Sequence, residues 1–169
     1  MTRPFPHRIR WAIEGLDLSP GQRVLEIGCG NGMSCMPICE RIDAGCYLGV
    51  DRSDKMIAAA RDRNAAWAER GMASFQCRDA TSLDNPDARF DRILAINVNL
   101  FWRQADAALE RLCPLLAPAG RLHLVFEPPD VAQLDAIARA CADGLLRHSF
   151  GAVAIRREGR CLELRVGPG

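Results

Sequence analysis

Short runs of consecutive apolar residues alternate along the chain with longer segments in which apolar residues recur every three or four positions. The short runs predict five strands, at 24–27, 46–50, 74–77, 92–96 and 122–126. The longer segments predict helices at about 33–43, 53–70, 103–116 and 130–143. This alternation predicts an α/β fold, a doubly wound parallel sheet between two layers of helices in a three-layer αβα arrangement.

Single polar or glycine residues mark the expected ends of these helices. Ser53 and Asp130 are predicted N-caps, because their side chains can accept hydrogen bonds from free backbone N–H groups. Gly71 and Gly144 are predicted helix stops. The connection at 79–89 is too short to hold a full helix as well as its turns.

The end of the chain departs from the alternation. Residues 148–157 and 160–166 predict two strands joined at Glu158-Gly159, and so short a turn requires an antiparallel pair. A length of 169 residues fits one domain. Within the single domain 1–169 we expect an N-terminal arm or helix at 1–20, a core at 22–126 and a C-terminal strand pair at 145–166.

The charge balance excludes partners that bind through a strong electric field. The 22 basic and 21 acidic residues leave a net charge of +1, too small to attract nucleic acid or anionic lipid over a distance. No run approaches the roughly 18 apolar residues of a membrane helix, and no secretory leader is recognisable. We therefore expect a cytoplasmic protein with reduced thiols and no membrane partner.

The eight cysteines show neither a C-x-x-C pair nor a neighbouring pair of histidines, so we predict no metal site. Cys35 and Cys39 are four residues apart and could share one helix face, where a soft-metal site is the alternative to packing. We expect most of the thiols to pack as small hydrophobic side chains.

The segment from Val24 to Gly32 is the strongest indication of a ligand-binding site in the sequence. An apolar strand containing Glu26 leads into glycines at alternate positions, Gly28, Gly30 and Gly32, and then into a helix. Glycines there allow a sharp turn and let a ligand lie against bare backbone. The G-x-G-x-x-G pattern of dinucleotide enzymes would need its third glycine where Met33 stands, so the loop favours a mononucleoside ligand.

Acidic residues follow the next two predicted strands. Asp51 comes after the strand at 46–50, and Asp79-Ala80 comes after the strand at 74–77. The carboxyl ends of parallel strands meet at one crevice, where Asp51 would lie near the ribose hydroxyls of a nucleoside. The alternative role for Asp51, a helix cap, suits Ser53 or Asp54 better.

The glycine loop, Asp51 and Asp79-Ala80 occur in the same order as in the class I S-adenosylmethionine-dependent methyltransferases, which the chain resembles. The E-x-G-x-G-x-G loop of that family matches Glu26 to Gly32, and the segments at 49–56, 90–94 and 115–121 extend the resemblance. The resemblance covers about 22–126 and indicates a small, minimal-core member with an unassigned substrate. It implies a Rossmann-like seven-stranded sheet in the order 3-2-1-4-5-7-6 with an antiparallel last strand, which the terminal hairpin suits.

The resemblance also implies how S-adenosylmethionine would be held as the cofactor. The loop of Gly28, Cys29, Gly30 and Gly32 would contact the methionyl part, while Glu26 would help hold the loop and the cofactor's amino group.

The adenosine part would lie further along the same strand ends. Asp51 would bind the ribose hydroxyls, with Arg52 and Met56 flanking the adenosine. Asp79 would accept a hydrogen bond from the adenine amino group, and the Ala80 N–H would donate to a ring nitrogen.

The substrate side is predicted from position. Asn97 ends the fourth strand and would border both cofactor and substrate; Asn97 or Asn99 could orient the acceptor. Phe101 or Trp102 could cover it, with packing against a helix as the alternative for both. Glu127 ends the fifth strand and is a candidate general base, or else an ordinary strand-end carboxylate. We thus name Asn97 and Glu127 as the catalytic candidates.

The resulting hypothesis is methyl transfer to a small organic molecule by in-line attack on a sulfonium methyl group. The absence of a [DN]-P-P-[YF] sequence after the fourth strand argues against adenine or glutamine as the acceptor. Two alternatives stay open: a methyltransferase-like binding or regulatory subunit, and a nicotinamide-dependent oxidoreductase. Little of the chain remains to cover the acceptor. We therefore expect a site that is either open or closed by a partner chain, such as the second copy in a homodimer.

Four further residue groups complete the candidates. His7, His123 and His148 are alternative general bases, with His123 expected inside the fifth strand. The basic cluster of Arg3, Arg8, Arg10 and Trp11 has three interpretations: a nucleic-acid footprint, a solvated helix face, or an arm that folds over the cofactor. We favour the solvated face and expect no nucleic-acid partner.

Overall fold

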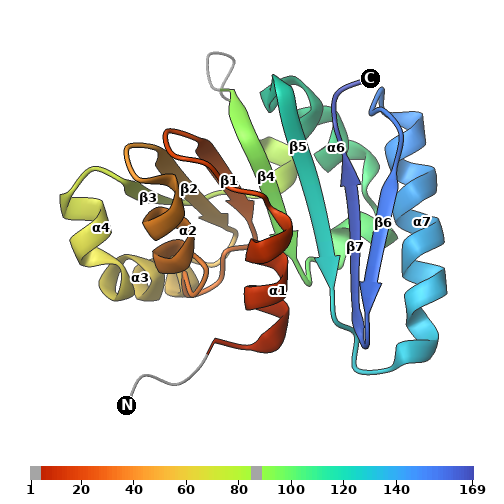
Figure 1. Ribbon diagram of the computed structural model, residues 1–169, viewed down its shortest axis with the longest axis horizontal. Coiled ribbons are helices and arrows are strands. Elements are labelled where there is room, and N and C mark those ends of the chain that lie inside the picture. Colours follow the sequence, from red (N-terminus) through yellow and green to blue (C-terminus); the bar gives the residue numbers. More distant parts are fainter. Residues whose placement is uncertain (1–4, 85–88) are drawn as a thin grey trace.

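The computed structural model describes residues 5–84 and 89–169, and in it seven strands form one sheet in the order β3-β2-β1-β4-β5-β7-β6 (Figure 1). The strands β1 to β5 run parallel, and β7 runs antiparallel to both of its neighbours, β5 and β6. The predicted sheet order and terminal hairpin are therefore confirmed. The strands are β1 (Arg23–Ile27), β2 (Cys46–Asp51), β3 (Ala73–Cys77), β4 (Phe90–Ile96), β5 (Leu116–Phe126), β6 (Ala154–Glu158) and β7 (Cys161–Val166).

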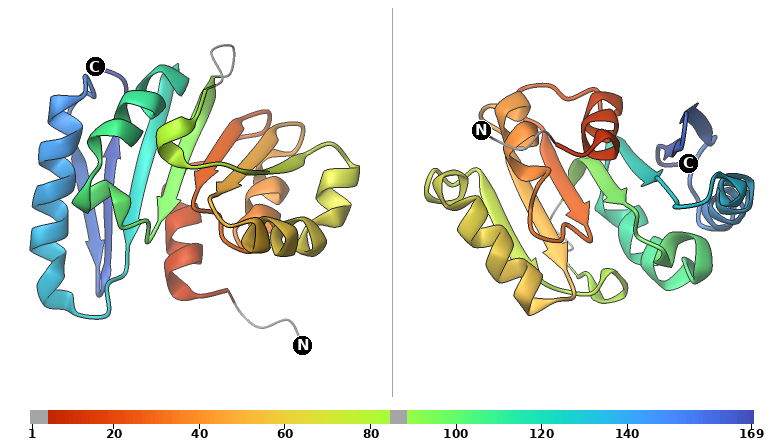
Figure 2. Two further views of the ribbon diagram at one scale, coloured as in Figure 1. Left: turned by 180° about the vertical axis from the view of Figure 1, so that it is seen from behind. Right: turned by 90° about the horizontal axis from the view of Figure 1, so that it is seen from below.

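Helices cover both faces of this sheet. One hydrophobic cluster joins the sheet to α1, α2 and α3, and a second joins it to α5, α6 and α7. Seen from behind, α6 and α7 lie in front of the sheet, on the face opposite α1 (Figure 2). The helices are α1 (His7–Gly15), α2 (Cys35–Ile42), α3 (Asp54–Arg63), α4 (Ala65–Glu69), α5 (Leu100–Arg103), α6 (Asp106–Leu112) and α7 (Leu134–Arg147), with 3-10 turns at Ala80–Ser82, Cys113–Leu115 and Val131–Gln133.

The predicted single helix at 53–70 is wrong, because the chain breaks at Asn64 into α3 and α4. Asn64 has a non-helical backbone (φ −115°, ψ 24°), and its buried side-chain amide donates to the carbonyls of Gly32 and Ala60 at 3.0 and 2.9 Å. Side-chain to backbone bonds of this kind compete with helix continuation. The break thus fastens the glycine loop to α3.

Gly144 is not a helix stop, because α7 continues to Arg147. A Cβ atom at Gly144 would lie 3.6 Å from Ala105 Cβ and 3.6 Å from Leu109 Cδ1, so the glycine lies where α7 packs against α6. The segment 145–147 consequently belongs to α7, and the C-terminal strand pair begins only at Ala154.

The segment predicted as a helix at 103–116 is also divided, into α5, α6 and a 3-10 turn, and β5 begins earlier than expected, at Leu116. A shift in the β4–β5 register accommodates the early start, since Phe90 pairs with Leu116 but Arg92 pairs with Arg121. Turns before α2 and α7 also make both helices begin later than expected.

The predicted caps are confirmed at three positions. Ser53 accepts from the backbone N–H of Met56, and Asp130 from that of Ala132. Gly71 follows α4 with a φ of +71°. Within 79–84 the chain forms only a 3-10 turn, whereas residues 85–88 and Arg3 lie outside the described residues. No helix in the described ranges is both long and apolar enough to span a bilayer.

Candidate functional site

A cavity of about 390 Å³ opens at the carboxyl ends of β1, β2 and β4. Seven residues predicted for the cofactor or substrate line it: Gly28, Asp51, Arg52, Asp79, Ala80, Asn97 and Asn99. Five predicted cofactor residues are not in its lining: Glu26, Cys29, Gly30, Gly32 and Met56. Sequence reasoning missed Arg78 and Val98, which also line it. We call this space the first cavity.

The glycine loop needs glycine for two separate reasons. Gly28, Gly30 and Gly32 have φ values of +68°, +53° and +70°, which side-chain-bearing residues rarely adopt. A Cβ atom at Gly28 would also lie 2.6 Å from Val98 Cγ2. One at Gly32 would lie 2.6 Å from Asn64 Nδ2. Bare backbone therefore forms the cavity wall at Gly28, while Gly32 packs against α3.

Asp51 fastens the loop from the neighbouring strand. Its Oδ2 accepts from the Gly30 N–H at 3.0 Å, and its Oδ1 accepts from the Ser53 N–H at 2.9 Å. Each carboxylate oxygen can accept more than one hydrogen bond. Asp51 can therefore hold the loop and still accept hydroxyl groups from a ligand in the first cavity.

Glu26 lies beneath the loop, where only 3% of its surface is exposed. Its carboxylate accepts hydrogen bonds from Ser34 Oγ and, at 2.5 Å, from the Tyr47 hydroxyl. Burial raises the pKa of Glu26 to about 7, although the two hydrogen bonds act in the opposite direction. Glu26 thus connects β1 to β2 and to the start of α2, and it positions the loop from below.

Asp79, predicted to bind adenine, already accepts hydrogen bonds from the 3-10 turn that follows it. Asp79 accepts from the Thr81 N–H at 2.9 Å and from Thr81 Oγ1 at 2.7 Å, and these bonds lower its pKa. Arg78, the residue before it, donates its backbone N–H to the Asp51 carbonyl at 3.0 Å. Met56 lies outside the cavity with 37% of its surface exposed, and Cys29 is buried.

A second cavity, of about 340 Å³, adjoins the first, since Asn97 and Asn99 line both. Predicted Trp102 and Glu127 line it, and so does Arg103, which sequence reasoning missed. Asn97 has a φ of +55°, a conformation that asparagine tolerates better than most residues. This backbone conformation places an asparagine side chain at the junction of the two cavities.

The two aromatic candidates after β4 have different surroundings. Phe101 is fully buried in the hydrophobic core and lines neither cavity, in agreement with the packing alternative. Trp102 lines the second cavity and donates its Nε1–H to Asn99 Oδ1 at 3.2 Å. The Arg103 guanidinium lies 4.8 Å from the centre of the Trp102 ring.

The N-terminal helix reaches the same edge of the sheet. Arg8 Nη1 lies 3.5 Å from Glu127 Oε2. Trp11 is 3% exposed, and the Arg156 guanidinium lies 3.8 Å from its ring centre, so this ring offers no stacking surface for a base. Arg10 is exposed to solvent. The described part of the basic cluster therefore combines a solvated face with a contact at the second cavity.

The remaining candidate bases lie apart from the cavity linings. His123 lies inside β5, as predicted, and is fully buried there, with its Nδ1 2.7 Å from Glu163 Oε1. His148 pairs with Asp106 at 2.6 Å between Nε2 and Oδ1. Cys35 and Cys39 share one face of α2, where both are buried with their sulfurs 3.8 Å apart.

Comparison with known proteins agrees with this geometry. A family model described as a methyltransferase domain matches residues 24–120. An O-methyltransferase of Pyrenophora dematioidea is 34% identical over 106 residues, which are 63% of this chain and 39% of that protein. Methyltransferase GfsG of Streptomyces halstedii is 31% identical over 134 residues, 78% of this chain and 46% of that protein. The chain thus spans less than half the length of these two relatives.

Among solved structures, a SAM-dependent methyltransferase from Aquifex aeolicus superposes with a TM-score of 0.74 at 16% identity. The superposition covers 94% of this chain and 88% of that one, and it shows a shared fold. The family match extends from β1 into β5, and it therefore includes the glycine loop, Asp51 and Asn97. This chain belongs to the class I S-adenosylmethionine-dependent methyltransferases.

Proposed function

We propose that the chain binds S-adenosylmethionine in the first cavity and transfers its methyl group to a small organic molecule held in the second. The shared wall of the two cavities carries this proposal, because Asn97 and Asn99 line both of them. Ligands in the two spaces would meet at these side chains. Such contact is what an in-line transfer between two bound molecules needs.

The residues around the first cavity fit the cofactor. Its volume of about 390 Å³ falls within the roughly 300–1,000 Å³ of small-molecule sites. The wall at Gly28 is bare backbone, which a Cβ atom would fill. Each Asp51 oxygen accepts one backbone N–H and can accept a ribose hydroxyl as well, and Asp79 and Ala80 line the same cavity for adenine. When bound, the cofactor supplies an electrophilic methyl group on a sulfonium sulfur.

The chain's own contribution is orientation and proton acceptance. Asn97 would position the acceptor at the junction, and Trp102 would cover it on one side. Glu127, which lines the second cavity, would accept the proton that an attacking hydroxyl group loses. A hydroxyl acceptor is also supported by the name of the Pyrenophora relative, an O-methyltransferase. A second copy of this chain as a cover over the acceptor stays a prediction.

The test is calorimetric titration of the full chain with S-adenosylhomocysteine, followed by mass spectrometry of phenols and hydroxy acids incubated with S-adenosylmethionine. We expect one molecule of S-adenosylhomocysteine to bind per chain, and a mass gain of one methyl group on at least one acceptor. A thermal shift with NADH but not with S-adenosylhomocysteine would favour the oxidoreductase alternative instead. Absence of binding at submillimolar S-adenosylhomocysteine would overturn the proposal.

A further inference from the structure

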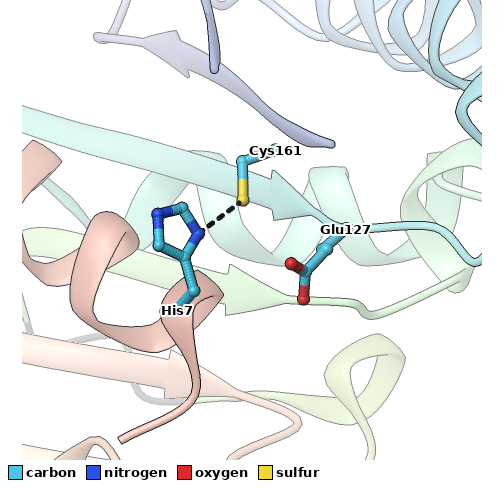
Figure 3. Close-up of side chains that lie close together, drawn as sticks. All are labelled: His7, Glu127 and Cys161. Carbon is cyan, nitrogen blue, oxygen red and sulfur yellow. Dashed lines mark hydrogen bonds between the residues drawn. The ribbon is translucent and has the colours of Figure 1, made fainter. Parts of the chain in front are cut away.

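His7, Glu127 and Cys161 converge from three separate elements at the edge of the sheet (Figure 3). His7 begins α1, Glu127 follows β5, and Cys161 begins β7. One ligand atom from each residue lies within 4.8 Å of the other two. His7 Nδ1 is 3.6 Å from Cys161 Sγ, although the two residues are 154 positions apart in the chain. A nitrogen, a sulfur and a carboxylate oxygen therefore point at one small region.

The imidazole of His7 also faces a second carboxylate, that of Glu158. Its Nε2 lies 3.6 Å from Glu158 Oε1, and Glu158 is itself held by a 3.1 Å hydrogen bond from Trp11 Nε1. A proton on Nε2 facing Glu158 leaves the Nδ1 lone pair directed toward the Cys161 sulfur. In metal sites the second ring nitrogen of a histidine commonly donates to a carboxylate, and Glu158 is the carboxylate that lies nearest to Nε2 for that role.

We propose that His7 Nδ1, Cys161 Sγ and a carboxylate oxygen of Glu127 bind one transition-metal ion of the zinc type, with the fourth position left for water or a small ligand. Mixed nitrogen, sulfur and oxygen ligands suit Zn²⁺ better than Mg²⁺ or Ca²⁺, which prefer oxygen alone. Zinc bonds of about 2.0–2.3 Å place tetrahedral ligand atoms roughly 3.3–3.8 Å apart. His7 Nδ1 and Cys161 Sγ already have this separation, and the Glu127 carboxylate, which lies within 4.8 Å of both, would move toward them on binding.

The sheet holds two of the three ligands near each other without the ion. Arg160, which precedes Cys161, donates Nη2 hydrogen bonds of 2.8 and 2.7 Å to the carbonyls of Pro128 and Pro129, the residues after Glu127. Glu127 would bind the ion through one carboxylate oxygen and keep the other as the proton acceptor of the proposed function. Arg8 Nη1 approaches the carboxylate at Oε2. The ion would then link His7 of α1 to Glu127 and Cys161, which the sheet already holds near each other. This link would fix the first turn of α1 beside the second cavity.

A cysteine binds a metal ion as the thiolate, so the Cys161 thiol must lose its proton on binding. Coordination forms a sulfur–metal bond and releases the thiol proton to solvent. Metal binding is therefore accompanied by proton release, which gives a measurement independent of methyl transfer.

The test uses the full chain after treatment with a chelator, titrated with Zn²⁺ by calorimetry and with Co²⁺ by absorption spectroscopy. We expect one equivalent of metal per chain, proton release into the buffer, and the charge-transfer absorption of a cobalt–thiolate bond. A wild-type protein that binds neither ion at micromolar concentration would overturn the proposal.

Variants identify the ligands. Cys161→Ser and His7→Gln should each weaken Zn²⁺ binding by roughly 100-fold or more, whereas Cys46→Ser, a thiol at the opposite edge of the sheet, should leave it unchanged. His7 is exposed, so His7→Gln tests the site even if Cys161→Ser fails to fold. A cobalt–thiolate band that survives Cys161→Ser and disappears in Cys39→Ser would assign the metal to the α2 pair and overturn the proposal. None of these results depends on cofactor binding.

Discussion

The side-chain oxygen of Asn97 accepts a 2.7 Å hydrogen bond from the backbone N–H of Glu127, and this bond joins the carboxyl ends of β4 and β5. It lies where the two cavities share a wall. Asn97 also has a left-handed backbone, with a φ of +55°. The same residue therefore sets the direction of the chain leaving β4 and the position of the candidate base on β5.

Replacement of Asn97 separates these two contributions. Asn97→Gly keeps the left-handed backbone without strain and loses the hydrogen bond, which is worth about 1 kcal/mol of unfolding free energy. Asn97→Ala loses the bond and also forces a side chain into this conformation, so we expect about 1 kcal/mol of further destabilisation. Urea unfolding measures both values. Equal stability of the two variants would show that the backbone relaxes there without strain.

Removal of the Asp51 carboxylate tests the ribose site. We expect Asp51→Ala to weaken S-adenosylhomocysteine binding by roughly one to three decades, because charge-assisted hydrogen bonds to two hydroxyls are lost. Asp62→Ala, which removes an exposed carboxylate on α3, is the matched control and should bind normally. Calorimetry measures both affinities. Unchanged binding by Asp51→Ala would place the ribose elsewhere.

Two glycines with the same backbone requirement differ in their surroundings. Gly28 and Gly21 have φ values of +68° and +82°, but a Cβ atom at Gly28 would lie 2.6 Å from Val98, whereas none of the described atoms lies within 4 Å of one at Gly21. Gly28→Ala should therefore abolish detectable S-adenosylhomocysteine binding. Gly21→Ala should lower the unfolding free energy by about 1 kcal/mol and bind normally. Similar binding by the two variants would contradict the placement of the cofactor against Gly28.

The buried Glu26 predicts how stability depends on pH. Burial raises its folded-state pKa from 4.5 to about 7, so the folded protein holds this proton more tightly than the unfolded chain does. The resulting stabilisation is fully present below about pH 4.5 and is lost as the pH rises through about 7. Because Gln cannot ionise, Glu26→Gln should lack this loss.

Urea unfolding of the wild type and of Glu26→Gln at pH 5 and pH 8 measures the effect. From pH 5 to pH 8 we expect the unfolding free energy of Glu26→Gln to rise by a few kcal/mol relative to that of the wild type. Glu69→Gln, an exposed site at the end of α4, is the control and should show no such gain. A parallel response of Glu26→Gln and the wild type would mean that Glu26 ionises freely in the folded protein.

Local patterns predicted the features that depend on local geometry. Apolar runs indicated the five parallel strands, and a turn too short for a crossover indicated the terminal hairpin. Alternate glycines after Glu26 indicated the loop, because positive φ angles favour glycine whatever surrounds it. Asp51 could be placed beside that loop because parallel strands end at one edge of the sheet.

Tertiary contacts decided the features that burial and distant partners control. Asn64 ends a helix because its amide finds the Gly32 carbonyl, 32 residues away. Gly144 continues a helix because α6 packs closely against it. Phe101 faces the core although its neighbour Trp102 faces a cavity. His7 and Cys161 meet only because α1 returns to the start of β7, so no spacing in the sequence indicates their contact. Such contacts depend on chain segments far apart in sequence, and residue periodicity carries no information about them.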